Sequence, residues 1–266
     1  MYNFNYHNPN TIEDCTKIFN SSDFPKYLAG GMTIIPALKQ KLSIPTDLID
    51  LQNIKSLKGI HLNDHKQITI GALNTHNEIA KSKIIQQYIK GLSYLAYNIA
   101  DNAVRNLGTI GGSICNSDPA ADYPAALLSL NATILTNKRN IKAKDFFVDM
   151  FETLLADDEI VVSISFPIVT HSYYLKFASQ ASKYALVGLF GSCNDNLIKL
   201  SITGASNKVF SIKELDGLTL QEFSKLNLDH LDLKKYYINN DIHATAEYRI
   251  ALIKHMIRNV LKYINN

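Results

Sequence analysis

The sequence predicts an α+β protein made of three successive segments, and three patterns along the chain support this. Short helical and strand-like patterns alternate over residues 11–51. Strand-like runs and helical stretches are then mixed up to residue 167. Three consecutive strand-like runs follow over residues 176–205, and the clearest helical pattern of the chain comes later, at residues 245–264. We place the segments at residues 1–60, 61–170 and 171–266.

The first segment predicts a small α/β lobe, because its helical stretches lie between strand-like ones. Ile12, Cys15 and Phe19 recur at helical spacing, and Pro36 stands early enough in the next helical stretch to occupy its first turn. The predicted elements are helices at 11–19 and 34–42 and strands at 27–29 and 48–51.

The second segment predicts strands and helices, and the third an antiparallel sheet with helices. In the last helix, apolar residues recur every three or four positions from Ala246 to Ile264. The predicted strands are 68–72, 109–115, 132–136, 160–167, 176–178, 185–193 and 198–205. The predicted helices are 77–89, 91–103, 119–130 and 245–264.

The composition excludes several classes of protein. With 46% hydrophobic and 19% charged residues among 266, the chain is neither disordered nor of low complexity. No apolar run is long enough to span a bilayer, so we expect no membrane insertion. The first 20 residues are polar and lack the pattern of a signal peptide, so we expect a cytoplasmic protein.

Charge and cysteine content narrow the function further. A net charge of +3, with 23 Lys and only 4 Arg, argues against a nucleic-acid partner. Cys15, Cys115 and Cys193 lie far apart, which excludes a zinc ribbon, a disulfide scaffold and an all-cysteine iron–sulfur cluster. We expect each of them to be a small buried side chain, and we predict no metal site.

A first glycine pair follows the strand at 27–29, in the stretch Ala29-Gly30-Gly31-Met32-Thr33-Ile34. Glycine permits a positive φ and a close approach of a ligand to the backbone. Successive amides in such a turn can hold an anion, and the Thr33 hydroxyl could add a donor. By itself, the pair fits either ordinary turn punctuation or a phosphate site.

A second pair stands about 80 residues later, in Thr109-Ile110-Gly111-Gly112-Ser113. This pair could also bring backbone donors to a pyrophosphate. Ser117 or Asp118 could cap the helix that follows, with Pro119 in its first turn. Asp122 is either a further cap or a carboxylate that binds a hydroxyl group.

Common nucleotide-binding and hydrolytic motifs are missing from the sequence. Neither glycine pair matches a dinucleotide-binding GxGxxG or a Walker A motif, and no GxSxG or HExxH occurs. We interpret His76 and His243 as turn or surface residues rather than ligands. A nucleotide would therefore be bound by a different architecture.

Taken together, the two pairs and the segments around them resemble one family along nearly the whole chain. The stretches that carry the resemblance are Ala29-Gly30-Gly31, Thr109-Ile110-Gly111-Gly112, Asp118-Pro119-Ala120-Ala121-Asp122-Tyr123-Pro124, Ile70-Gly71-Ala72-Leu73-Asn74-Thr75-His76, Glu159-Ile160-Val161, Lys176-Phe177 and Glu247-Tyr248-Arg249. With these stretches in their order along the chain, the sequence resembles the FAD-binding medium subunits of molybdenum hydroxylases, the xanthine dehydrogenase and carbon monoxide dehydrogenase family.

The resemblance implies a two-lobed FAD-binding domain of the vanillyl-alcohol-oxidase (PCMH) type, followed by a C-terminal domain of antiparallel sheet and helices. Asp122 would bond a flavin or ribityl hydroxyl, and Ile99 would lie against the flavin ring. The residues implied to bind FAD are Ala29, Gly30, Gly31, Met32, Thr33, Ile34, Thr109, Ile110, Gly111, Gly112, Ser113, Asp122, Val161 and Lys176.

The resemblance also implies partners: a 2Fe–2S subunit that supplies electrons and a molybdopterin-binding large subunit. The electrons would pass on to NAD⁺, a quinone or O₂, and the chain would need no catalytic residue of its own. One alternative is a free-standing flavin oxidase or reductase that uses Tyr123 or Tyr184 as a proton donor. Others are an FAD-free scaffold subunit, or an unrelated α/β protein in which the glycine pairs are turns.

Overall fold

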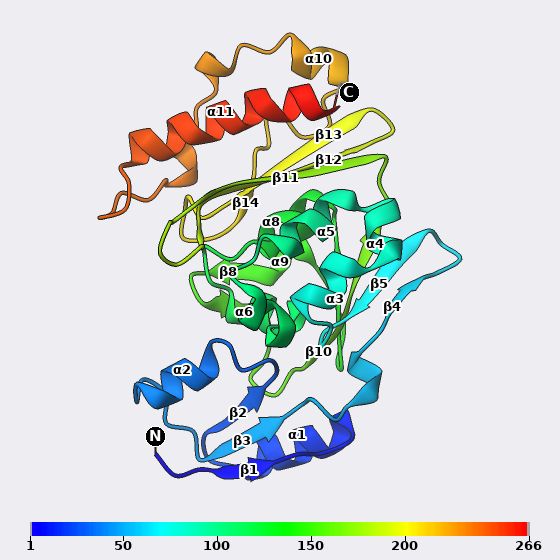
Figure 1. Ribbon diagram of the computed structural model, residues 1–266, viewed down its shortest axis with the longest axis vertical. Coiled ribbons are helices and arrows are strands. Elements are labelled where there is room, and N and C mark those ends of the chain that lie inside the picture. The colour runs from blue at the N-terminus through cyan, green and yellow to red at the C-terminus, as the bar shows by residue number, and fades with distance from the viewer. Residues whose placement is uncertain (1, 265–266) are drawn as a thin grey trace.

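The computed structural model describes residues 2–264, and its mixture of helices and sheets confirms the predicted α+β class. Three groups of elements follow one another along the long axis of the molecule, with the N-terminal group at one end and the C-terminal group at the other (Figure 1). Among the described residues, no helix is both long enough and apolar enough to cross a membrane.

The N-terminal group contains a three-stranded sheet in the order β1-β3-β2, in which neighbouring strands run parallel. Its core includes Cys15 and Ile49, both fully buried. The helices and strands predicted here are confirmed, with Pro36 in the first turn of α2. The elements are β1 (Asn5–His7), α1 (Ile12–Ser21), β2 (Pro25–Leu28), α2 (Ile34–Lys39), β3 (Asp47–Asp50) and η1 (Lys55–Leu57).

The middle group contains an antiparallel five-stranded sheet in the order β4-β5-β10-β6-β7, with helices packed against it (Figure 1). Its strands are β4 (Ile60–Leu62), β5 (Gln67–Gly71), β6 (Thr133–Thr136), β7 (Asn140–Lys142) and β10 (Val161–Pro167). Its helices are α3 (His76–Lys81), α4 (Lys83–Tyr88), α5 (Lys90–Tyr97), α6 (Asn102–Leu107), α7 (Ile110–Asn116), α8 (Tyr123–Ser129) and α9 (Ala143–Phe146). A short hairpin of β8 (Phe147–Asp149) and β9 (Glu152–Thr153) stands beside them.

Two helices predicted as continuous are each divided, and in both cases a new N-cap explains the division. The helix predicted at 77–89 restarts at Ser82, whose side chain accepts the Ile85 amide. The helix predicted at 91–103 ends with α5 and restarts at Asp101, which accepts the Val104 amide. Side-chain caps of this kind stabilise a helix start where the backbone has left the helical path.

The strand predicted at 109–115 is wrong: α7 occupies this stretch. Thr109 is its N-cap and accepts the Gly112 amide, and Ser117 ends it with a positive φ of 46°. The following helix, α8, begins at Tyr123 rather than Pro119, with Pro124 in its first turn. Local sequence favoured a strand because β-branched and glycine residues are poor helix formers, and tertiary packing decided otherwise.

The C-terminal group contains a four-stranded antiparallel sheet in the order β11-β12-β13-β14. This confirms the antiparallel sheet predicted for the third segment. The long helix α11 covers one face of this sheet, and α5 and α8 pack against the other (Figure 1). The elements are β11 (His171–Ala178), β12 (Ala185–Asn194), β13 (Leu197–Thr203), β14 (Phe210–Ser211), α10 (Leu220–Ser224), η2 (Leu228–His230), η3 (Lys234–Tyr236) and α11 (Ala246–Ile264).

Candidate functional site

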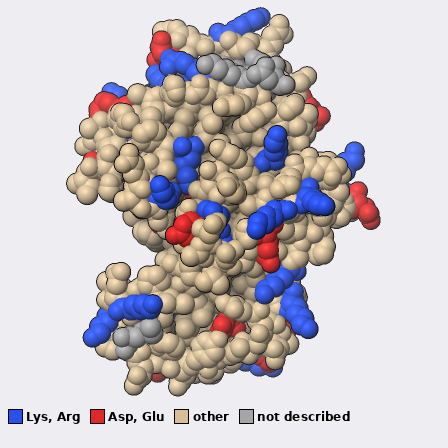
Figure 2. Space-filling model, in the orientation of Figure 1, with Lys and Arg blue, Asp and Glu red and all other residues tan. Residues whose placement is uncertain are grey.

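A cleft of about 1560 Å³ runs between the N-terminal group and the rest of the chain. The molecule narrows between these two parts in the space-filling view (Figure 2). Most of the predicted site residues line this cleft, although they come from separate stretches of sequence. Those that line it are Ala29, Gly30, Gly31, Met32, Thr33, Ile34, Thr109, Gly111, Gly112, Ser113, Asp122 and Val161.

Two predicted site residues do not line the cleft. The Ile110 side chain is fully buried in the core of the middle group. Lys176 points into a smaller neighbouring pocket, from which its ammonium reaches Asp122. Ile99, which the resemblance placed against the flavin ring, does line the cleft.

The loop of the first glycine pair presents free backbone donors to the cleft. The amides of Gly30, Gly31, Met32 and Thr33 donate to no acceptor in the described part of the chain. Gly31 has a φ of +74°, a conformation that side chains disfavour. A chain of unpartnered amides in such a turn forms a concave surface that binds anions, so the loop is fit to hold a phosphate group.

The second glycine pair does not present free donors. The amide of Ile110 donates to the Asn74 carbonyl at 3.1 Å, and that of Gly111 to the Ala72 carbonyl at 2.8 Å. The Gly112 amide is bonded to the Thr109 hydroxyl at 3.1 Å. The prediction that this pair supplies backbone donors is therefore wrong for these amides. What Gly112 supplies is a helix surface without a side chain, which leaves room for a ligand.

Asp122 is buried and does not cap α8, since its side chain accepts no amide at the helix start. Its Oδ1 atom instead accepts the hydroxyl of Tyr174 and forms an ion pair with the Lys176 ammonium at 2.9 Å. No donor among the described residues reaches Oδ2. Burial raises the pKa of Asp122, while Lys176 and Tyr174 oppose that rise. The carboxylate thus keeps one acceptor atom for a ligand.

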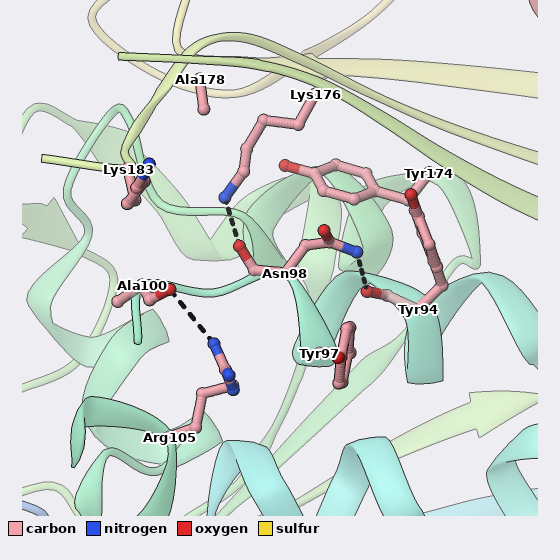
Figure 3. A pocket seen from close by; sticks show the side chains of 9 residues that line it. All are labelled: Tyr94, Tyr97, Asn98, Ala100, Arg105, Tyr174, Lys176, Ala178 and Lys183. Atoms are coloured by element: carbon pink, nitrogen blue, oxygen red, sulfur yellow. Dashed lines mark hydrogen bonds between the residues drawn. The ribbon is translucent and has the colours of Figure 1, made fainter. Parts of the chain in front are cut away.

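The smaller pocket, of about 310 Å³, adjoins the cleft, because Ala100 and Lys183 line both. Figure 3 shows Tyr174 and Lys176 facing it, with the Lys176 ammonium donating to the Asn98 carbonyl at 2.8 Å. The guanidinium of Arg105 donates to the Ile99 and Ala100 carbonyls at 2.7 and 3.1 Å. These cations hold the loop between α5 and α6 in place.

Tyr174 is a site residue that the sequence reasoning missed. It stands two positions before Lys176 on β11, and alternate residues of a strand point to the same face. In the sequence, this spacing of two residues from Lys176 is the pattern that indicates Tyr174 as a neighbour of Lys176. The partner, Asp122, is 52 positions away, so only the tertiary structure brings them together.

The burial of the other residues discussed from the sequence agrees with the expectations only in part. His76 is buried, with Nδ1 3.1 Å from the Tyr123 hydroxyl, so its interpretation as a turn or surface residue is wrong. Tyr123 is fully buried and cannot serve a substrate, whereas Tyr184 lines the cleft. Cys15 and Cys193 are buried as expected, but Cys115 is exposed.

Comparisons with known proteins agree over most of the chain. Residues 2–169 match the family described as "FAD binding domain in molybdopterin dehydrogenase". The chain is 29% identical to the nicotine 6-hydroxylase medium subunit of Paenarthrobacter nicotinovorans, covering 96% of this chain and 95% of that protein. It is 34% identical to the carbon monoxide dehydrogenase medium chain of Hydrogenophaga pseudoflava, covering 70% of this chain and 67% of that one.

The fold is also shared with solved structures. A chain of reconstituted CO dehydrogenase from Oligotropha carboxidovorans superimposes with a TM-score of 0.89 and 25% identity. The superposition covers 97% of this chain and 96% of that one. The family match, the relatives and the shared fold therefore agree with one another. The chain belongs to the family of FAD-binding domains of molybdopterin dehydrogenases, and it is an oxidoreductase subunit whose cofactor is FAD.

Proposed function

We propose that this chain is the FAD-carrying electron-transfer subunit of a cytoplasmic molybdenum hydroxylase complex. It receives electrons from 2Fe–2S clusters on a partner subunit and passes them to NAD⁺, a quinone or O₂. A molybdopterin-binding large subunit is the third component. The proposal includes the vanillyl-alcohol-oxidase (PCMH) type of FAD-binding domain, with lobes at residues 1–60 and 61–170 and a C-terminal domain at 171–266.

One observation carries the proposal: both glycine stretches and Asp122, which the sequence separates widely, line a single cleft. The free amides of Gly30 to Thr33 are the groups that would hold the FAD pyrophosphate. Gly112 would allow the cofactor to lie against α7, and Asp122 Oδ2 would accept a hydroxyl hydrogen. When bound, FAD supplies the redox chemistry, because a flavin can take up and release electrons.

The names of the relatives support the partner part of the proposal. Nicotine 6-hydroxylase and CO dehydrogenase are both represented by a medium subunit or chain, which implies further subunits in those enzymes. No group of three or more His, Cys, Asp or Glu within residues 2–264 could hold a metal ion. We propose that the iron–sulfur clusters, which need side-chain ligands of this kind, lie on a partner chain.

The experiment is to purify the tagged full chain with whatever subunits accompany it, and to record the visible spectrum. We expect a flavin spectrum, release of FAD on denaturation, and co-purifying iron–sulfur and molybdenum subunits. Anaerobic reduction of the complex, followed by addition of NAD⁺, a quinone or O₂ in turn, identifies the acceptor. A complex without FAD that also fails to take up added FAD would overturn the proposal.

A further inference from the structure

A buried cluster of Asp122, Tyr174 and Lys176 joins residues of the cleft to residues of the smaller pocket. Asp122 reaches the cleft, whereas Tyr174 and Lys176 line the pocket. Both donors meet the same carboxylate atom, Oδ1. Since a carboxylate has two acceptor oxygens, this arrangement uses one and leaves Oδ2 for the cleft.

The position of the Tyr174 hydroxyl is set by packing and not only by this hydrogen bond. The ring lies 6.3 Å from that of Phe190, centroid to centroid, and is almost completely buried. Gly188 on β12 leaves room for the hydroxyl, because a Cβ atom there would lie 2.7 Å from it. Packing therefore helps to fix the place of the hydroxyl, from which it donates to Asp122 Oδ1.

Lys176 by itself would not hold the carboxylate in one orientation. Its ammonium also donates to the Asn98 carbonyl, so it is shared between two acceptors at 2.8 and 2.9 Å. An ammonium is a point charge on a flexible stem and imposes little direction on its partner. The Tyr174 hydroxyl adds a second, directed bond on Oδ1, and two donors on one atom leave the carboxylate a single orientation.

We infer that Tyr174 is a positioning residue of the FAD site: it holds Asp122 Oδ1 so that Oδ2 faces the cleft as the acceptor for a hydroxyl of FAD. This inference rests on the proposed function. It extends that function by a residue whose side chain faces away from the cleft and acts only through Asp122.

The charges around Asp122 give the inference a pH signature. Lys176 and Tyr174 on β11 favour the ionised carboxylate, whereas burial and the charge of Asp118 favour the protonated one. Tyr184, in the loop after β11, and the neighbouring Tyr123 also feel the charge of Asp122. Removing the Tyr174 hydroxyl leaves burial opposed by Lys176 alone. The pKa of Asp122 then rises, and FAD should be lost at a higher pH than in the wild type.

The test measures FAD affinity of the complex for the wild type, Tyr174→Phe, Asp122→Asn and the double variant. We expect Tyr174→Phe to weaken FAD binding about tenfold, the size of one lost hydrogen bond, and to shift its loss to higher pH. In the Asp122→Asn background, Tyr174→Phe should have no further effect. Tyr173→Phe, the same change one position earlier on the strand, should bind FAD as the wild type does.

Unchanged affinity and pH profile in Tyr174→Phe, or an equal loss in the Asp122→Asn background, would overturn the inference while leaving the proposed function intact. A wild-type complex without FAD would overturn the proposed function instead. If Tyr174→Phe fails to fold, Gly188→Ala takes its place, combined with Thr203→Ser, since the new Cβ would lie 2.7 Å from the Tyr174 hydroxyl and 2.8 Å from Thr203 Cγ2, and serine lacks that Cγ2 atom. It should weaken FAD binding in the same way, and wild-type binding would count against Tyr174.

Discussion

The two glycine pairs face the same cleft, yet they are glycine for different reasons. Gly31 has a positive φ, and the amides around it are free. Gly111 and Gly112 lie in a helix without positive φ, and their amides are bonded within the chain. The first pair offers hydrogen-bond donors to a ligand, and the second offers the absence of side chains. A repeated dipeptide in a sequence can therefore reflect two different physical requirements.

The two pairs also differ in the atoms that a side chain at each glycine would meet. A Cβ atom on Gly30 would lie 2.0 Å from the carbonyl oxygen of Leu107, at the end of α6. A Cβ on Gly111 would lie 2.7 Å from both the Cβ and the carbonyl oxygen of Ala72. Gly112 has more room, with the Thr109 hydroxyl at 3.0 Å and Ala29 Cβ at 3.5 Å as its nearest neighbours. The effects of these three glycines can thus be distinguished by substitution.

The largest effect is expected for Gly30→Ala. The new methyl group would overlap backbone atoms of Leu107 and Gly108, which cannot move without shifting α6. We expect a loss of at least about 3 kcal/mol in the free energy of unfolding and no FAD retention. Thermal unfolding and flavin content measure the two effects. Wild-type stability in this variant would mean that Leu107 and Gly108 can shift away from Gly30 at little cost in free energy.

Gly111→Ala should destabilise the fold without entering the FAD site. The methyl group points at Ala72 and its backbone, under α7, and should cost about 1–3 kcal/mol of unfolding free energy. Denaturant unfolding measures this loss. The Ala72→Gly variant removes one of the two close contacts, so it should restore part of the stability. A stable Gly111→Ala protein that has lost only FAD would place this residue in the binding surface instead.

Acidification should lower the free energy of unfolding through His76, which is bonded to the chain just before the second glycine pair. Burial and, to a lesser degree, the charge of Arg105 lower the pKa of His76 to about 4, and its amide donates to the Gly108 carbonyl. The folded state holds this histidine neutral, whereas the unfolded chain takes up a proton near pH 6.5. The contribution of His76 to the free energy of unfolding is therefore fully present above pH 6.5 and falls as the pH drops toward 4. At pH 5 the loss should be about 1–2 kcal/mol.

Unfolding midpoints from pH 7 to 5 check this expectation. His76→Gln should remove this part of the pH dependence, and His243→Gln, a change at an exposed histidine, should keep it. An unchanged slope in His76→Gln would assign the pH dependence to other groups.

Gly112→Ala should have the smallest effect on stability and the most selective one on binding. Alanine is a better helix former than glycine by about 1 kcal/mol, so the unfolding midpoint should stay or rise. The methyl group projects into the cleft, and we expect FAD affinity to fall about tenfold, equal to about 1.4 kcal/mol. Titration with FAD measures this. Equal losses of stability and affinity would mean that the two glycines of α7 act alike.

The sequence by itself determined the class of the fold and most of its strands, because strand alternation and helical spacing are local properties. It also indicated the glycine stretches and Asp122, since their chemistry and order along the chain can be read directly. The long helix near the C-terminus was equally evident, because its apolar stripe extends over 19 residues.

Only the tertiary structure decided how these residues work. Residues 109–115 read locally as a strand, and packing of Gly111 on Ala72 with the cap at Thr109 makes them a helix. Burial made His76 a neutral core residue, and no periodicity shows this. The bond between Tyr174 and Asp122 joins residues 52 positions apart. Local pattern records the preference of each segment, whereas close packing between distant segments fixes which groups are bonded and which stay free for a ligand.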